Sequence, residues 1–167
     1  MNLTKTANIA DKINRKLGQA VSWLALLMAI LMFLNVICRY IFNSNLIWQQ
    51  ELVGFMHAIL FLAAAGYTLQ EDKHVRVDVL YQSLSVRNKA IVNLVGTLIF
   101  LLPVCFAISY LSYDFILSSW KIREASAEYN GMQGVYLLKS CIWVFTFSLI
   151  LQGLSNIAKS IITLKGE

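Results

Sequence analysis

The amino-acid sequence predicts an all-α integral membrane protein, with four transmembrane helices, a basic amphipathic interfacial helix before them, and both termini in the cytoplasm. Of its 167 residues, 58% are hydrophobic and 14% are charged, whereas a soluble domain has about 45–50% apolar and about 25% charged residues. With 8 glycines and 1 proline, little of the chain is typical of loops. A water-soluble enzyme is excluded, because a globule of this length cannot bury so much apolar surface.

Four stretches are long enough to cross a membrane. A helix needs about 20 apolar residues to span a hydrocarbon core about 30 Å thick. The stretches that meet this requirement are residues 19–38, 46–69, 91–117 and 135–157. Unpaired backbone amides are too costly in lipid, and these stretches lack the alternation of a β-barrel, so we expect helices. Residues 1–167 then form a single membrane domain.

The distribution of basic residues predicts the orientation. Ten lie before the first stretch, between the second and third, or after the fourth: Lys5, Lys12, Arg15, Lys16, Lys73, Arg76, Arg87, Lys89, Lys159 and Lys165. Four lie on the other side: Arg39, Lys121, Arg123 and Lys139. The positive-inside rule places the richer side, and with it both termini, in the cytoplasm. The chain is thus predicted to be a multi-pass protein of the bacterial inner membrane.

Residues 3–17 have the pattern of an amphipathic helix. Apolar residues recur every three or four positions: Leu3, Ala7, Ala10, Ile13 and Leu17. Basic residues occupy the other faces: Lys5, Lys12, Arg15 and Lys16. This pattern predicts a separate helix that binds membrane lipids at the cytoplasmic surface. The alternative is a solvated tail that only sets the topology.

Few ionisable residues fall at or near membrane depth, and each is a candidate for function. Arg39 and Glu51 flank the turn between the first two stretches, and we expect them to form an ion pair across it or to extend to the membrane interface, rather than to act as a proton or ion relay. Trp48 lies one turn before Glu51 on the same helix face, which also carries Gly54 and Ala58.

The chain offers no recognisable catalytic or metal-binding set. His57 is the one histidine at membrane depth, so ligation of haem by two histidines lacks a partner, and we expect His57 to form a hydrogen bond within the helix packing. The cysteines (Cys38, Cys105 and Cys141) have no CxxC spacing and are interpreted as small buried hydrophobic residues. We therefore expect no catalytic residue, metal or cofactor here, and no nucleic-acid partner, because the basic residues are dispersed.

Two further features concern the second half of the chain. Pro103 is predicted to kink the third helix, because its ring removes one backbone hydrogen bond. The connection 118–134 is amphipathic, and either forms a short interfacial helix or extends the third helix beyond the bilayer.

Four short motifs occur in a characteristic order. They are Arg39-Tyr40-x-Phe42, Trp48-x-x-Glu51-Leu52, Gly66-Tyr67, and the segment His74-Val75-Arg76-Val77-Asp78-Val79-Leu80. Their order and spacing resemble the small membrane subunit of tripartite ATP-independent periplasmic (TRAP) transporters, the DctQ-like family. The likeness extends over the four-helix plan. One departure is that residues 126–134 lack the proline that the family often has before its last helix.

The resemblance implies a role as a non-catalytic scaffold. Such a subunit braces a large membrane subunit that holds the substrate and sodium sites, while a periplasmic binding protein delivers an organic acid, of the sialic acid or C4-dicarboxylate class; we favour sialic acid. The interface or structural residues would be Arg39, Trp48, Glu51, Gly54, Ala58, His74 and Asp78. His74 and Asp78 would cap or tether an inner helix. Two alternatives remain, an autonomous four-helix multidrug or proton exporter and a membrane anchor of a respiratory enzyme.

Overall fold

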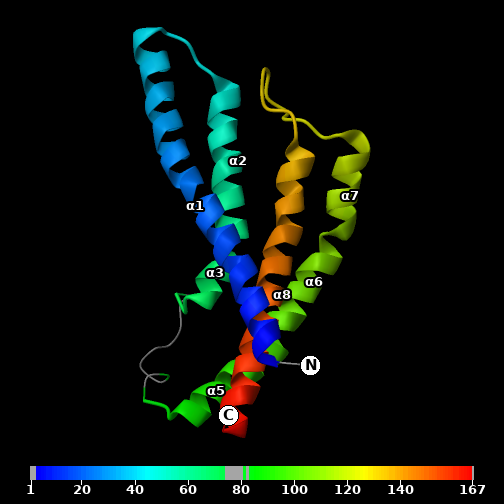
Figure 1. The fold of residues 1–167 in the computed structure, drawn as a ribbon. Coiled ribbons are helices and arrows are strands. Elements are labelled where there is room, and N and C mark those ends of the chain that lie inside the picture. Colours follow the sequence, from blue (N-terminus) through cyan, green and yellow to red (C-terminus); the bar gives the residue numbers. More distant parts are fainter. Residues whose placement is uncertain (1–2, 74–80, 82, 167) are drawn as a thin grey trace.

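The computed structural model describes residues 3–73, 81 and 83–166, and their secondary structure is helical apart from one isolated β-bridge (Figure 1). Four helical segments are long and apolar enough to cross a membrane. They are α1 (Leu3–Ile41); α2 (Ile47–Ala63) with α3 (Ala65–Gln70); α5 (Val86–Gly96), the π-helical turn η1 (Thr97–Leu101), α6 (Leu102–Leu111) and α7 (Tyr113–Ile122); and α8 (Val135–Lys165). The predicted all-α class with four spans is confirmed.

Both ends of the described chain lie at the same end of the bundle (Figure 1). α1 runs beside α2, α8 runs beside α6 and α7, and these two groups converge near the termini and spread apart toward the α1–α2 turn. We call the end with the termini the predicted inner end, because the basic residues favour the cytoplasm there. The end with the α1–α2 turn and residues 123–134 is the predicted outer end.

The first helix differs from the prediction, because residues 3–17 are not a separate element. α1 is one helix of 39 residues, about 58 Å long at 1.5 Å per residue and so about twice the thickness of the hydrocarbon core. The junction contains no proline, and Gly18 lowers helix stability by only about 1 kcal/mol. Ala7 and Ala10 are buried inside the protein, and the carbonyl of Ala7 accepts a hydrogen bond from Ser155 of α8.

The second and third spans are each interrupted within their length. Ala64 separates α2 from α3. In the third span, η1 immediately precedes α6, and Pro103 occupies the second position of α6. A proline cannot donate to the preceding turn, and a π-helical turn is a common way to absorb such a disturbance. The structure thus places a π-helical turn directly before the turn that contains Pro103, while the predicted kink itself stays a prediction.

The core lies where α3 and α6 meet α8. Ala65, Cys105 and Leu149 form its buried cluster. Gly66 lets α3 approach α8 closely, since a Cβ at this position would lie 2.7 Å from the carbonyl oxygen of Ser148. All three cysteines are free, with Cys105 buried and the other two partly buried.

Candidate functional site

The predicted outer end is organised around the carboxylate of Glu51, in the second turn of α2. Glu51 accepts hydrogen bonds from the hydroxyl of Ser126 and from the backbone N–H of Met132. The expected ion pair with Arg39 is wrong, because within the described residues Glu51 is bound by the connection between α7 and α8. The Glu51 carboxylate therefore receives its two hydrogen bonds from this loop instead of from the guanidinium of Arg39.

The connection over residues 123–134, which we call the outer loop, is a compact turn. Arg123 ends α7 in the left-handed conformation (φ 48°). An antiparallel bridge joins Ala125 to Gln133, and the backbone N–H of Ser126 donates to the carbonyl of Met132 at 3.0 Å. The third span therefore extends to Ile122, as one of the two predictions had it, but the rest forms no interfacial helix.

Gly131 allows the outer loop to close over Glu51. A Cβ at this position would lie 2.7 Å from Oε2 of Glu51 and would also collide with the side chain of Ser126. Glycine is needed here because the backbone passes so near the carboxylate.

A second contact, an ion pair, joins the outer loop to the start of α8. Lys139 donates to Glu124 and lies 4.1 Å from the centre of the Phe115 ring. The ammonium group of Lys139 holds the pKa of the Glu124 carboxyl below its ordinary value. Nearby, the indole N–H of Trp120 donates to the hydroxyl of Ser140 at 2.8 Å, which joins α7 to α8.

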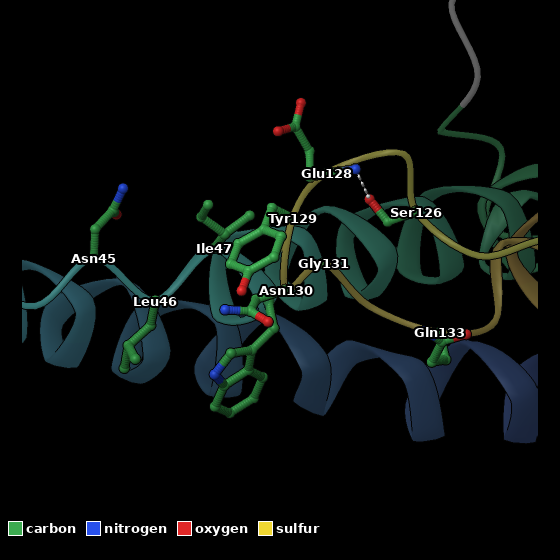
Figure 2. A pocket seen from close by; sticks show the side chains of 10 residues that line it. Asn45, Leu46, Ile47, Ser126, Glu128, Tyr129, Asn130, Gly131 and Gln133 are labelled. Carbon is green, nitrogen blue, oxygen red and sulfur yellow. Dashed lines mark hydrogen bonds between the residues drawn. The ribbon is translucent and has the colours of Figure 1, made fainter.

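An open pocket of 870 Å³ lies between the outer loop and the start of α2 (Figure 2). Its lining residues are mostly amides, hydroxyls and aromatic or apolar side chains: Asn45, Leu46, Ile47, Trp48, Ser126, Glu128, Tyr129, Asn130, Gly131 and Gln133. In Figure 2, Tyr129 and Asn130 lie beside Ile47. Aromatic and amide groups of this kind are typical of protein contact surfaces. The lining holds no nucleophile–base pair and no cluster of acids for a metal.

The other predicted interface residues of α1 and α2 lie mainly on the outside. Arg39 and Gly54 are exposed, Trp48 is 46% exposed, and Ala58 is half-buried. His57 is exposed and stacks on Phe61 with ring centres 6.4 Å apart, so the predicted packing hydrogen bond is not among the bonds of the described residues. A lipid-facing histidine is costly, which favours a protein partner on this face.

The residues predicted to act at the inner end include two that the structure does not describe and four that it does. His74 and Asp78 lie outside the described residues. The four basic residues of the N-terminal segment (Lys5, Lys12, Arg15 and Lys16) are all exposed on α1. Across the described ranges, no group of three or more histidines, cysteines, aspartates and glutamates could hold a metal ion.

A polar network that the sequence analysis missed joins α1 to α8 near the predicted inner end. Asp11 accepts hydrogen bonds from Ser155 (2.7 Å) and Gln152 (3.1 Å), and pairs with Lys159 (2.7 Å). The amide of Asn14 donates to Gln152 at 3.0 Å and to the carbonyl of Ser148 at 3.1 Å. Asp11 is the sole acid in α1, and it lies three residues before Asn14, so the two share a face.

Comparison with known proteins gives one family match. The family model described as the DctQ component of tripartite ATP-independent periplasmic transporters matches residues 28–163, well over half of the chain. The matched region contains the outer loop, all of α2 and most of α8.

Two curated relatives agree with the family model. One is the C4-dicarboxylate TRAP transporter small permease protein DctQ of Vibrio cholerae, 34% identical over 93 residues, which are 56% of this chain and 37% of the relative. The other is a putative TRAP transporter small permease protein of Haemophilus influenzae, 32% identical over 101 residues, which are 60% of this chain and 62% of the relative. The matches thus span less than two thirds of the length of either relative. No solved structure matches the chain.

Proposed function

The chain belongs to the DctQ component family of the TRAP transporters, as a multi-pass protein of the bacterial inner membrane, and from this premise we propose that it is a non-catalytic scaffold subunit. In this role it braces a large transport subunit of a sodium-coupled importer. A periplasmic binding protein delivers the substrate, an organic acid of the C4-dicarboxylate or sialic acid class. The substrate and the coupling sodium ions are bound by the partners.

The observation that carries the proposal is the exposed apolar surface of α1. In its most apolar stretch of 18 residues, only 6% of the residues are buried. Large side chains such as Trp23 and Phe33 are more than half exposed. A helix that contributes so little to its own bundle has most of its surface free for lipid or for the helices of another subunit.

The α2 surface supports the same role. Gly54 and His57 are exposed on this helix, and a Cβ at Gly54 would meet nothing within 4 Å. Small residues permit close approach between membrane helices, and a histidine needs a hydrogen-bonding partner there. Both features favour contact with the large subunit along α2. The pocket at the outer loop would lie on the periplasmic side of that contact.

Hydrogen bonds and ion pairs join the helices at both ends of the bundle, which suits a subunit that stays fixed during transport. Glu51 and Glu124 hold the outer loop at one end, and the Asp11–Ser155–Lys159 group joins α1 to α8 at the other. An autonomous proton exporter would need a carboxylate exposed to a translocation path, whereas Glu51 is engaged by the outer loop.

The proposed substrate class rests on the name of one relative and on the family resemblance. The Vibrio cholerae relative is named for C4-dicarboxylates, whereas the Haemophilus influenzae relative is named without a substrate. An organic acid is therefore the proposed cargo, with sialic acid and four-carbon dicarboxylates as the two substrates to test.

Reconstitution in vesicles tests the proposal. We expect uptake of labelled succinate or sialic acid when the chain, the large subunit, the binding protein and an inward sodium gradient are all present. Vesicles that lack only this chain should show strongly reduced uptake. Uptake by this chain alone would overturn the scaffold role in favour of an autonomous carrier. A Soret band in the purified chain would favour the respiratory anchor.

A further inference from the structure

A groove at the predicted outer end, between the last turns of α1 and the first turns of α2, is separate from the pocket under the outer loop. Its volume is 530 Å³. The polar residues that line it are Asn35, Arg39, Tyr40 and Gln50, and the apolar ones are Met32, Val36 and Val53. No carboxylate is among these lining residues. The groove is therefore basic at its rim and apolar in the direction of the membrane centre.

Asn35 brings unmet hydrogen-bonding capacity to this groove. It is only 8% exposed, and its side-chain oxygen has no hydrogen-bond partner among the described residues. A buried polar atom without a partner is costly, so such groups normally bind another part of the protein, water or a ligand. The amide can both donate and accept, and it lies one helical turn from Arg39 on the same face of α1.

Arg39 is available to bind an anion. Its side chain is exposed and, within the described part of the chain, forms no ion pair. Glu51, which follows the groove residue Gln50 in the sequence, already accepts hydrogen bonds from the outer loop. The guanidinium offers five donors in a planar arrangement that matches a phosphate group.

The depth of these residues matches a phospholipid. Arg39 lies two residues from the end of α1, and Gln50 lies in the first turn of α2, so both are near the membrane surface. Met32 is seven residues earlier in α1, about 10 Å deeper along the helix axis. The hydrocarbon half-thickness is about 15 Å. A phosphate at the rim would thus lie above an acyl chain in the apolar part.

We propose that this groove binds one phospholipid of the predicted outer leaflet. The phosphate binds Arg39, the side-chain N–H of Asn35 donates to an ester carbonyl of the glycerol region, and one acyl chain lies over Met32 and Val36. A free inorganic anion would leave these two half-exposed side chains uncovered. A lipid offers an anion to the guanidinium of Arg39 and an acceptor to the amide nitrogen of Asn35, and it covers the apolar surface, which favours it over the anion alone.

Native mass spectrometry tests this site on the full chain, purified in mild detergent with any subunit that it retains. We expect one phospholipid to remain bound after detergent exchange. Arg39→Gln should reduce the retained fraction about tenfold, as expected for loss of a charge-assisted hydrogen bond. Asn35→Leu, which keeps the branching of the side chain but removes its polar atoms, should also reduce it. Lys121→Gln is the matched control, because Lys121 is an exposed cation of the same predicted side outside the groove.

A second measurement guards against a variant that fails to fold. Phosphatidylethanolamine or phosphatidylglycerol, returned to the delipidated wild-type protein, should raise its melting temperature, and diacylglycerol of the same chains should not. Equal lipid retention in wild type and Arg39→Gln would overturn the proposal. So would displacement of the lipid by inorganic phosphate, which indicates a free-anion site, or a groove without lipid while the other subunits remain attached, which indicates a protein occupant.

Discussion

The side-chain amide of Asn14 in α1 donates a hydrogen bond to the side-chain oxygen of Gln152 in α8 at 3.0 Å, across 138 positions of sequence. Both side chains are fully buried. Gln152 in turn donates to Asp11 (3.1 Å) and Asn156 (3.3 Å). This relationship joins the N-terminal third of α1 to the bundle, although the sequence predicts a separate surface helix there.

Asn14→Leu should destabilise the protein by about 1–3 kcal/mol, because it leaves Gln152 buried without one of its partners. Thermal unfolding in detergent, followed by circular dichroism, measures the effect. Asn8→Leu is the control, since Asn8 is an exposed asparagine of the same helix and its substitution should be nearly neutral. Equal melting temperatures for both variants would show that the buried network does not stabilise the fold.

Glu51→Gln should loosen the outer loop, because the charge that accepts from Ser126 and Met132 is lost. We expect several-fold faster proteolysis within residues 123–134, and a lower yield of the transporter complex with unchanged substrate preference. Glu128→Gln is the matched control for the proteolysis, because Glu128 is a neighbouring carboxylate whose side chain is exposed. A change of substrate preference with normal assembly would contradict the proposed scaffold role.

Two glycines of the second span should respond in opposite ways to alanine. Gly66→Ala should cost about 1–3 kcal/mol, because its Cβ would collide with the backbone of Ser148 in α8. Gly54→Ala should stabilise the isolated chain by up to about 1 kcal/mol, because it faces open space inside a helix. Melting temperatures of the purified chains compare the two.

The same Gly54→Ala variant tests the proposed contact with the large subunit. If α2 lies against that subunit, the added methyl group should lower the yield of co-purified complex even though the chain itself is more stable. An unchanged yield would place the contact on another helix.

Acidification should break the ion pair between Glu124 and Lys139. The pKa of Glu124 is held below its ordinary value of 4.5, so its stabilising contribution is fully present above pH 4.5 and is lost as the pH falls through the lowered value. We expect a spin label on the outer loop to gain mobility in that acidic range. Glu124→Gln should show the higher mobility already at neutral pH, while Glu128→Gln should titrate like the wild type. If the mobility of the label in the wild-type protein did not change on acidification, the ion pair between Glu124 and Lys139 would not restrain the outer loop.

Much of the fold could be predicted because hydrophobic length alone specifies it. The four spans are confirmed, since each stretch had to be helical in lipid. The π-helical turn before Pro103 was not predicted, although the missing backbone donor of this proline had marked the region for a kink. The helix ends were less predictable, because hydropathy marks only the part inside the bilayer, whereas α1 and α8 continue beyond it to Leu3 and Lys165.

The candidate site was predictable only in part. Glu51 and Trp48 were singled out because charges and aromatic residues near a membrane surface are informative. The partner of Glu51 could not be inferred, because Ser126 and Met132 lie more than 70 positions away and only the turn of the outer loop brings them near. The placement of His57 on the outer face, with Phe61, likewise depended on how α2 is rotated.

Composition and apolar periodicity by themselves determined that this chain crosses a membrane four times as helices, because lipid accepts few other structures. The tertiary structure alone decided which polar groups meet. Asp11 and Asn14 could have faced water or headgroups, and packing against α8 made them partners of Gln152 and Ser155. The physical reason is that a buried polar group must find a partner, and helix rotation and crossing, which local sequence does not encode, determine which one is in reach.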